Sequence, residues 1–410
     1  MDKSPIIIGA GIAGLSSALA LAHKGIASTV IEKRKQLDAV GAGIQLTPNV
    51  TRILARWGIL GKLTAAGVTP HFLELRSGIS LETHLRADLI RLSKQSWNAP
   101  YITIHRANLQ KVLHNAVIEN PLIRYKAGET VISCSQTATK NIDVKTIKTD
   151  AKIETKQQFY STPLLIVCDG VWSTLRQLAP FHEKADFSGL IAWRATIGLE
   201  NLPEKLRSLS RDMKTITAWM GPKNHLVVYP IQLSEKILNF VAITRGKNEK
   251  ETWSYEGKKE KLSSLFKGWN PKISQTFDHI GGWRCWPLFK MRCSRFLGLE
   301  RQVFVGDCAH AILPFAAQGA AMAIEDAATL AEALSLKNHS LTESLSVYER
   351  MRSPRVAAVR RRGDFNRMVY HATGPVAIIR DFIMKIRGPE SMMSDLNWLY
   401  THDVMNLTKK

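Results

Sequence analysis

The sequence predicts an α/β protein that begins with a Rossmann-like domain, carries an inserted β-sheet domain and ends in helices. Three observations predict the first domain: an apolar run at 6–8, a glycine-rich turn at 9–14, and Glu32 at the end of the next apolar run. Strand, glycine turn, helix, strand and terminal acid form the βαβ unit that binds a nucleotide.

Each glycine of the turn has a physical role in such a unit. Gly9 allows the tight turn out of the strand, and Gly11 lets the backbone approach a pyrophosphate. Gly14 lets the helix over 15–24 pack close to the sheet. Unpaired N–H groups at the helix N-terminus favour phosphate, and Glu32 can accept hydrogen bonds from a ribose hydroxyl.

Composition limits the class of protein. A chain of 410 residues with 45% hydrophobic residues is long enough for two domains with sizeable cores. Five cysteines without a CxxC pair predict buried thiols in a reducing compartment. The uncharged run 6–22 is short for a membrane span and is interrupted by three glycines, so we expect a cytoplasmic protein, not a secreted one.

The net charge of +21 is spread along the chain. It favours anionic ligands, with weak membrane-surface association as the lesser alternative, and no DNA- or RNA-binding signature accompanies it. We therefore expect no nucleic-acid partner.

The remaining elements follow from periodicity. A glycine-rich loop is predicted at 41–49, and a β-meander of short strands over 123–159. Other strands are expected within 72–91 and at 164–168, 190–197, 225–231, 237–244 and 302–305. Helices are expected at 106–113, at 318–334 and through most of the C-terminal part, where the last amphipathic stretch is 376–387.

Two further motifs follow buried strands. One is Asp169-Gly170, continuing to Arg176; the other is Gly306-Asp307, continuing through Pro314 to Gln318–Ala327. With the N-terminal unit they resemble the three signatures of the single-component (class A) FAD-dependent aromatic hydroxylases. Within that family the chain looks most like the branch of salicylate hydroxylase and 6-hydroxynicotinate 3-monooxygenase. Segments that suggest the branch are Gly41–Asn49, His105-Arg106, Trp193-Arg194, His225 to Pro230, and Trp398 to Tyr400.

The resemblance implies a glutathione-reductase-type FAD-binding domain made of 1–71, 101–180 and 290–345. A substrate-binding sheet domain would comprise 72–100 and 181–289, and 346–410 a helical segment. The cofactor would be FAD, with NADH or NADPH and O2 as co-substrates. The implied reaction hydroxylates a small phenolic or heteroaromatic acid, salicylate-like, through a flavin C4a-hydroperoxide. We expect no metal, and a monomer or homodimer.

The resemblance also implies the cofactor site. Asp307 would hold a ribityl hydroxyl, and the helix beginning near Gln318 would direct its positive N-terminus at the flavin ring. The expected FAD-binding residues are Gly9, Gly11, Ala13, Gly14, Glu32, Lys33, Gly43, Ile44, Arg106, Val131, Asp169, Asp307, Gln318, Gly319 and Ala320.

Gln45, His225 and Tyr229 are the candidate catalytic residues. His225 and Tyr229 share one face of a strand, where they could polarise a phenol, although half-buried residues at a strand edge often have no such role. The branch acting on hydroxynicotinate has a histidine at the position of Gln45, and the 3-hydroxybenzoate branch has an amide at Pro314. Both departures favour a salicylate-like substrate.

Other interpretations stay open. One is a hydroxylase of a lipophilic quinone precursor at a membrane surface; another is a flavin-binding protein without turnover. Arg194 could guide an anionic substrate or face solvent. The run 360–362 is expected on an exposed helix face. The stretch 376–387 would dock on its own core or, less commonly, on a membrane surface.

Overall fold

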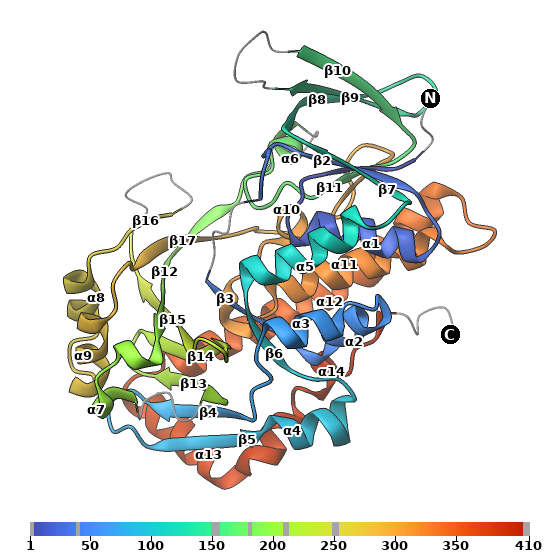
Figure 1. Ribbon diagram of the computed structural model, residues 1–410. Helices are drawn as coiled ribbons and strands as arrows, with labels where there is room; N and C mark the ends of the chain where they lie inside the picture. The colour runs from blue at the N-terminus through green and yellow to red at the C-terminus, as the bar shows by residue number, and fades with distance from the viewer. Residues whose placement is uncertain are drawn as a thin grey trace.

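The computed structural model describes residues 4–37, 42–148, 156–178, 183–207, 213–247 and 254–404. Gly41, at the start of the glycine-rich loop, and 405–410 of the C-terminal segment lie outside these residues. Two sheets lie at opposite ends of the molecule, with helices packed beside and between them (Figure 1).

The first sheet is parallel and has the strand order β18-β11-β1-β2-β7. Its strands are β1 (Ile6–Ile8), β2 (Ser28–Glu32), β7 (Ile123–Ala127), β11 (Leu165–Val167) and β18 (Gln302–Phe304). Short apolar runs form these strands because helices cover the sheet and bury its side chains. Helix α1 (Ile12–His23) packs against α5 (Arg106–Ile118) and α11 (Gly319–Leu334).

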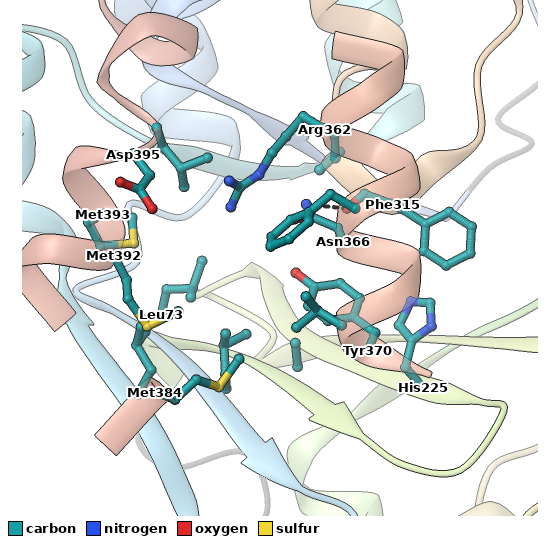
Figure 2. A pocket seen from close by; sticks show the side chains of 18 of the residues that line it. Leu73, His225, Phe315, Arg362, Asn366, Tyr370, Met384, Met392, Met393 and Asp395 are labelled. Carbon is teal, nitrogen blue, oxygen red and sulfur yellow. Dashed lines mark hydrogen bonds between the residues drawn. The ribbon is translucent and has the colours of Figure 1, made fainter. Parts of the chain in front are cut away.

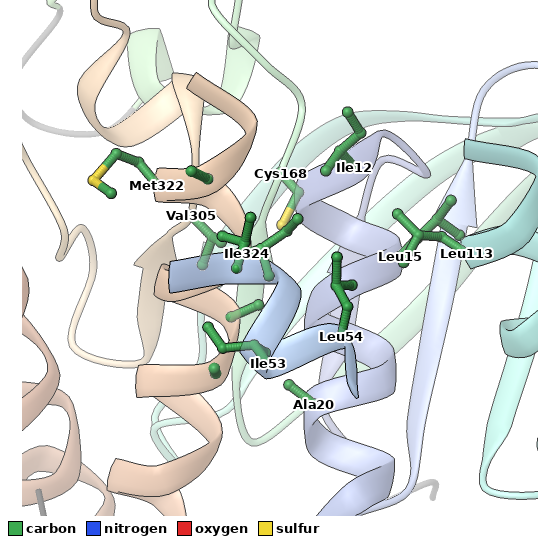
Figure 3. Packing of buried hydrophobic residues seen from close by; sticks show 14 of the residues in the cluster. Ile12, Leu15, Ala20, Ile53, Leu54, Leu113, Cys168, Val305, Met322 and Ile324 are labelled. Carbon is green, nitrogen blue, oxygen red and sulfur yellow. The ribbon is translucent and has the colours of Figure 1, made fainter. Parts of the chain in front are cut away.

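Close packing holds this domain together. Figure 3 shows Ile12 and Leu15 of α1 in one buried cluster with Ile53 and Leu54 of α2 (Pro48–Arg56) and Ile324 of α11.

The predicted meander over 123–159 divides in two. β7 belongs to the parallel sheet, whereas β8 (Glu129–Gln136), β9 (Ile142–Lys148) and β10 (Lys156–Thr162) form a separate antiparallel sheet.

The large sheet has eight strands in the order β16-β17-β12-β15-β14-β13-β4-β5. They are β4 (Phe72–Ser77), β5 (Thr83–Asp88), β12 (Asp186–Gly198), β13 (Thr215–Met220), β14 (His225–Gln232), β15 (Ile237–Arg245), β16 (Tyr255–Glu256) and β17 (Arg284–Lys290). Distant parts of the chain meet where β13 pairs in parallel with β4. The domain limits proposed above remain a prediction.

One face of the large sheet is closed by an aromatic cluster. Trp193, Trp219 and Phe240 pack there with Phe277 and Trp283, beneath α8 (Lys259–Leu265) and α9 (Pro271–His279). Since this face is filled, the opposite face is the one available for a site.

A two-stranded ribbon of β3 (Gly43–Leu46) and β6 (Ile102–His105) connects the two parts of the molecule. The N–H of Gly43 donates to Asn239 Oδ1 over 2.7 Å. A Cβ at Gly43 would lie 2.7–2.8 Å from Ile231, Asn239 and Tyr229. This glycine is therefore needed for the ribbon to approach the large sheet.

The connections between these elements contain five short helices: α3 (Leu60–Ala66), α4 (Leu89–Leu92), α6 (Thr174–Leu178), α7 (Glu204–Arg207) and α10 (Asp307–His310).

The C-terminal part is helical, as predicted. α12 (Leu341–Tyr370) begins with a capping box between Ser340 and Glu343. α13 (Gly374–Ser394) is broken at Gly388, whose φ is 69°, and α14 (Asn397–Tyr400) follows. Within the described part of the chain, none of the helices combines the length and apolar character required to cross a bilayer.

Candidate active site

The N-terminal turn forms a cradle at the start of α1. Gly9 has a φ of 97°, and its N–H donates to Ile31 O over 2.8 Å. A Cβ at Gly14 would lie 1.8 Å from Gly9 O, whereas a Cβ at Gly11 would meet no protein atom within 4 Å. Open space therefore lies beside Gly11 at the helix N-terminus, where backbone N–H groups can bind a pyrophosphate.

Glu32 is fixed beside this cradle. Its carboxylate accepts hydrogen bonds from Ala10 N–H at 2.6 Å and Arg34 N–H at 2.9 Å. Lys33 is exposed directly after it, and Val131 is half-buried on β8. Their contacts with a bound nucleotide remain predictions.

Asp307 lies where β18 ends and α10 begins. Gly306 before it has a φ of 77°, and a Cβ there would come within 2.9 Å of Ala13 Cβ, so α1 approaches this turn closely. Asp307 is exposed, yet the surrounding protein desolvates it and raises its pKa, an effect that His310 and Arg106 oppose. Desolvation likewise lowers the pKa of Arg106, whose charge is partly balanced by Asp307.

Asp169 offers a second acceptor. Its Oδ1 atom is buried and lacks a hydrogen-bond partner within the described residues, and burial raises the pKa of this carboxyl group. The cradle at Gly11, the acceptor at Asp169 and the Asp307 carboxylate near Arg106 together fit the hydroxyl and phosphate groups of FAD. Arg176 has a structural role instead, because it donates to Cys308 O and Ala309 O and so holds α10.

The N-terminus of α11 is positioned by buried polar side chains. Gln318 donates to Thr47 Oγ1 over 3.0 Å and accepts from Asn49 Nδ2 over 3.1 Å. The hydrogen bonds of the Gln318 side chain are therefore made to other residues of the protein. At Gly319 a Cβ would meet nothing within 4 Å, so open space lies beside the first residue of α11.

A buried charge network anchors the same helix. Arg352 of α12 contacts Glu325 at 2.8 Å and Asp326 at 2.6 Å, and Arg355 contacts Glu325 at 2.8 Å. Burial alone would raise the pKa of Glu325, but Arg355 and Arg352 hold it well below its usual range. Asp326 also accepts from Gly306 N–H over 2.8 Å. The network thus ties the α11 helix to the turn that carries Asp307.

A cavity of about 340 Å³ lies between the large sheet, the turn at 314–317 and helices α12 and α13 (Figure 2). Most of its lining is apolar, including Leu73, Met384 and Met392. The polar groups that reach it include Gln45, Tyr101, His225, Arg362, Asn366 and Asp395.

His225 is buried in the wall of this cavity. Its Nδ1 lies 2.8 Å from Nε2 of His371, and its ring packs 5.3 Å from that of Phe315. Burial lowers the pKa of His225 well below its usual range, and His371 lowers it further. Burial also lowers the pKa of His371 to about 4, with Arg367 adding to the effect. Both imidazoles are therefore neutral near pH 7, and one donates a hydrogen bond to the other.

Gln45 connects two tyrosines at the ribbon. Tyr101 Oη donates to Gln45 Oε1 over 2.6 Å, and Gln45 lies close enough to Tyr229 to oppose the rise that burial causes in its pKa. Burial raises the pKa of Tyr229, although Arg194 opposes this. Tyr229 packs against Gly43. Gln45 and His225 face the cavity. Arg194 is half-buried, with its guanidinium 5.4 Å from the Trp286 ring, so it does not simply face solvent.

Comparisons with known proteins identify the family. Residues 3–363 match the family described as FAD binding domain. A 3-hydroxybenzoate 6-hydroxylase of Klebsiella oxytoca is 30% identical over 395 residues, which cover 96% of each protein. This chain belongs to the family of FAD-dependent aromatic hydroxylases. FAD is its cofactor, as predicted.

Other relatives of the hydroxylase share its length and fold. A 3-amino-4-hydroxybenzoate 2-monooxygenase of Streptomyces platensis is 30% identical over 396 residues, 96% of this chain and 94% of that protein. A salicylate hydroxylase substrate complex matches with a TM-score of 0.79 at 20% identity, covering 98% of this chain and 96% of that one. At such identity the structural match shows the fold alone.

Sequence reasoning missed several residues of the hydroxylase's cavity. The run 360–362 was expected on an exposed helix face; the structure exposes only Arg361 fully, and Arg362 points into the cavity (Figure 2). Arg362 Nε is buried and has no hydrogen-bond partner among the described residues. Tyr101, Asn366 and His371 were not predicted either. A weak signal existed for Tyr101, which directly precedes the strand before Arg106.

Proposed function

We propose that this protein hydroxylates a small aromatic acid that carries a phenolic hydroxyl group, using NADH or NADPH and O2. The observation that carries the proposal is the cavity, which combines an apolar lining with an arginine and a neutral histidine. The relatives act, by their names, on hydroxybenzoates and an aminohydroxybenzoate, which are acids of this kind.

The chain's own residues suggest which group of the substrate each would bind. The Arg362 guanidinium suits the substrate carboxylate because its buried Nε has no partner among the described residues. His225, held neutral by burial, suits the phenolic hydroxyl as a hydrogen-bond acceptor or donor. The apolar walls exclude water from the ring between them.

The FAD cofactor, when bound, supplies the redox and oxygen chemistry of the family. FAD would be held by Gly11, Glu32, Asp169 and Asp307. The N-terminus of α11 would be directed at the anionic edge of the flavin. The protein contributes the orientation of the substrate and the placement of charge.

Turnover with a panel of substrates tests the proposal. Purified holoenzyme is mixed with NADH or NADPH and with salicylate, 3-hydroxybenzoate, 4-hydroxybenzoate, 6-hydroxynicotinate or the matching amides. We expect accelerated oxidation with at least one acid and, in ¹⁸O2, a product carrying one labelled oxygen. The proposal would be contradicted if none of the aromatic acids accelerated the oxidation of NADH or NADPH.

A second candidate is the hydroxylation of a lipophilic quinone precursor. The specific observation in its favour is the mouth of the cavity, which is lined by exposed apolar side chains of α13, among them Ile379 and Ile383. Including a prenylated phenol in the panel separates the two candidates: exclusive turnover of that compound would favour the second.

A further inference from the structure

Helix α13 turns its apolar side to solvent. Val376, Ile378, Ile379, Phe382, Ile383 and Ile386, which we call the α13 stripe, are each 45–72% exposed. At 100° per residue these positions lie on one side of the helix, opposite the buried Met384. The docking of this stretch onto its own core, expected as the commoner outcome, is therefore wrong for these six residues.

The stripe does not end at the helix. Phe365 and Met368 on the last turns of α12 are 49% and 57% exposed and lie, with three residues of the stripe, around the cavity mouth. Exposed apolar side chains that gather in one patch, instead of being scattered singly, mark a binding surface. In Figure 1, α13 lies along the outer edge of the molecule beneath β5, away from the nucleotide-binding sheet.

Charge indicates what covers the surface. The segment 360–387 contains seven arginine or lysine residues and two aspartates, a net charge of +5 within a chain of +21. Arg380, Lys385 and Arg387 border the stripe and pair with Asp381, Glu82 and Asp395 in that order. A second copy of the chain would bring two equally positive surfaces together, because a twofold interface pairs a patch with itself. An anionic lipid surface is complementary instead.

We propose that the α13 stripe docks this hydroxylase on a bilayer surface rich in anionic phospholipid. The isoleucine and phenylalanine side chains enter the boundary between headgroups and acyl chains, and the flanking cations face the headgroups. Docking places the cavity mouth at the lipid interface, so that a substrate or product with apolar character can pass between bilayer and cavity.

Vesicle co-sedimentation of the FAD-loaded enzyme tests the proposal. We expect binding to vesicles of phosphatidylglycerol and phosphatidylcholine, little binding to phosphatidylcholine alone, and weakening when salt is raised. The double variant Ile378→Glu with Phe382→Glu removes two stripe residues that do not line the cavity. Its vesicle affinity should fall at least tenfold, with unchanged FAD absorbance and unchanged turnover of a water-soluble substrate.

Phe159→Glu provides the matched control. Phe159 is 72% exposed on β10, in the separate three-stranded sheet, and its replacement should leave vesicle binding unchanged. Wild-type enzyme that stays in the supernatant with anionic vesicles would overturn the proposal. So would a dimer that the double variant converts to a monomer without any lipid binding, because the stripe would then be a subunit interface.

Discussion

His225 Nδ1 lies 2.8 Å from His371 Nε2, which joins a strand of the large sheet to the residue that ends α12. The contact closes one wall of the cavity with two neutral imidazoles. Both groups have pKa values below their usual range, because burial disfavours the charged form. Their protonation is therefore linked to the stability of the fold.

The stability of the enzyme should fall as pH falls from 6.5 towards 4. Over this window the unfolded chain binds protons at these two histidines and the folded chain does not, so each contributes up to about 1.4 kcal/mol per pH unit. Well above pH 6.5 both histidines are neutral in the folded and the unfolded chain. Their contribution to the free energy of unfolding therefore no longer changes with pH.

Chemical denaturation at a series of pH values measures this dependence. The variant His225→Gln with His371→Gln should show a shallower loss of unfolding free energy between pH 6.5 and 4.5. A slope equal to that of the wild type would show that these imidazoles are not the groups involved. His23→Gln, which replaces a histidine at the end of α1 away from the cavity, controls for the loss of an imidazole elsewhere.

Two glycines of the N-terminal turn should respond differently to alanine. Gly11→Ala adds a Cβ to open space, so the apoprotein should keep its Tm, while FAD binding weakens at least about tenfold, or about 1.4 kcal/mol. Gly14→Ala places a Cβ against Gly9 O and should destabilise the fold itself by about 1–3 kcal/mol or more.

FAD titration followed by flavin fluorescence, together with thermal unfolding of the apoproteins, separates the two effects. Normal FAD affinity in Gly11→Ala would mean that the pyrophosphate does not occupy the space beside this residue.

Arg352→Met should destabilise the protein by about 3–5 kcal/mol, because it leaves Glu325 and Asp326 buried with one cation fewer. Urea denaturation measures the effect. Arg292→Met is the control: its pair with Asp186 is largely exposed, so its unfolding midpoint should barely change. A loss below about 1 kcal/mol for Arg352→Met would contradict the assigned role of the network.

Arg362→Met should raise the KM for an aromatic acid by about 10–100-fold, the effect of losing a charge-assisted hydrogen bond of about 1.5–3 kcal/mol. The KM for the corresponding amide should change much less, and FAD binding should stay the same. Arg361→Met, one residue away and exposed, is the matched control. Equal changes for acid and amide would remove Arg362 as the carboxylate-binding group.

Local patterns predicted a large part of the fold. The glycine spacing at 9–14 and Glu32 predicted the βαβ unit, because turn geometry and close helix packing restrict residues within a few positions of one another. Strand positions at 225–231 and 237–244 were also predicted correctly. The division of 123–159 between two sheets was not, since strand pairing depends on partners far away in the chain.

The sequence by itself determined the nucleotide-binding unit and, through three motifs, the cofactor. Only the tertiary structure decided which residues form the cavity. Arg362 faces inward because the packing of α12 fixes the rotation of that helix, and His371 reaches His225 because α12 ends at the sheet. The amphipathic pattern of α13 was visible in the sequence. Its outward direction was not, because periodicity gives the spacing of a face, whereas the surrounding elements decide whether that face is covered.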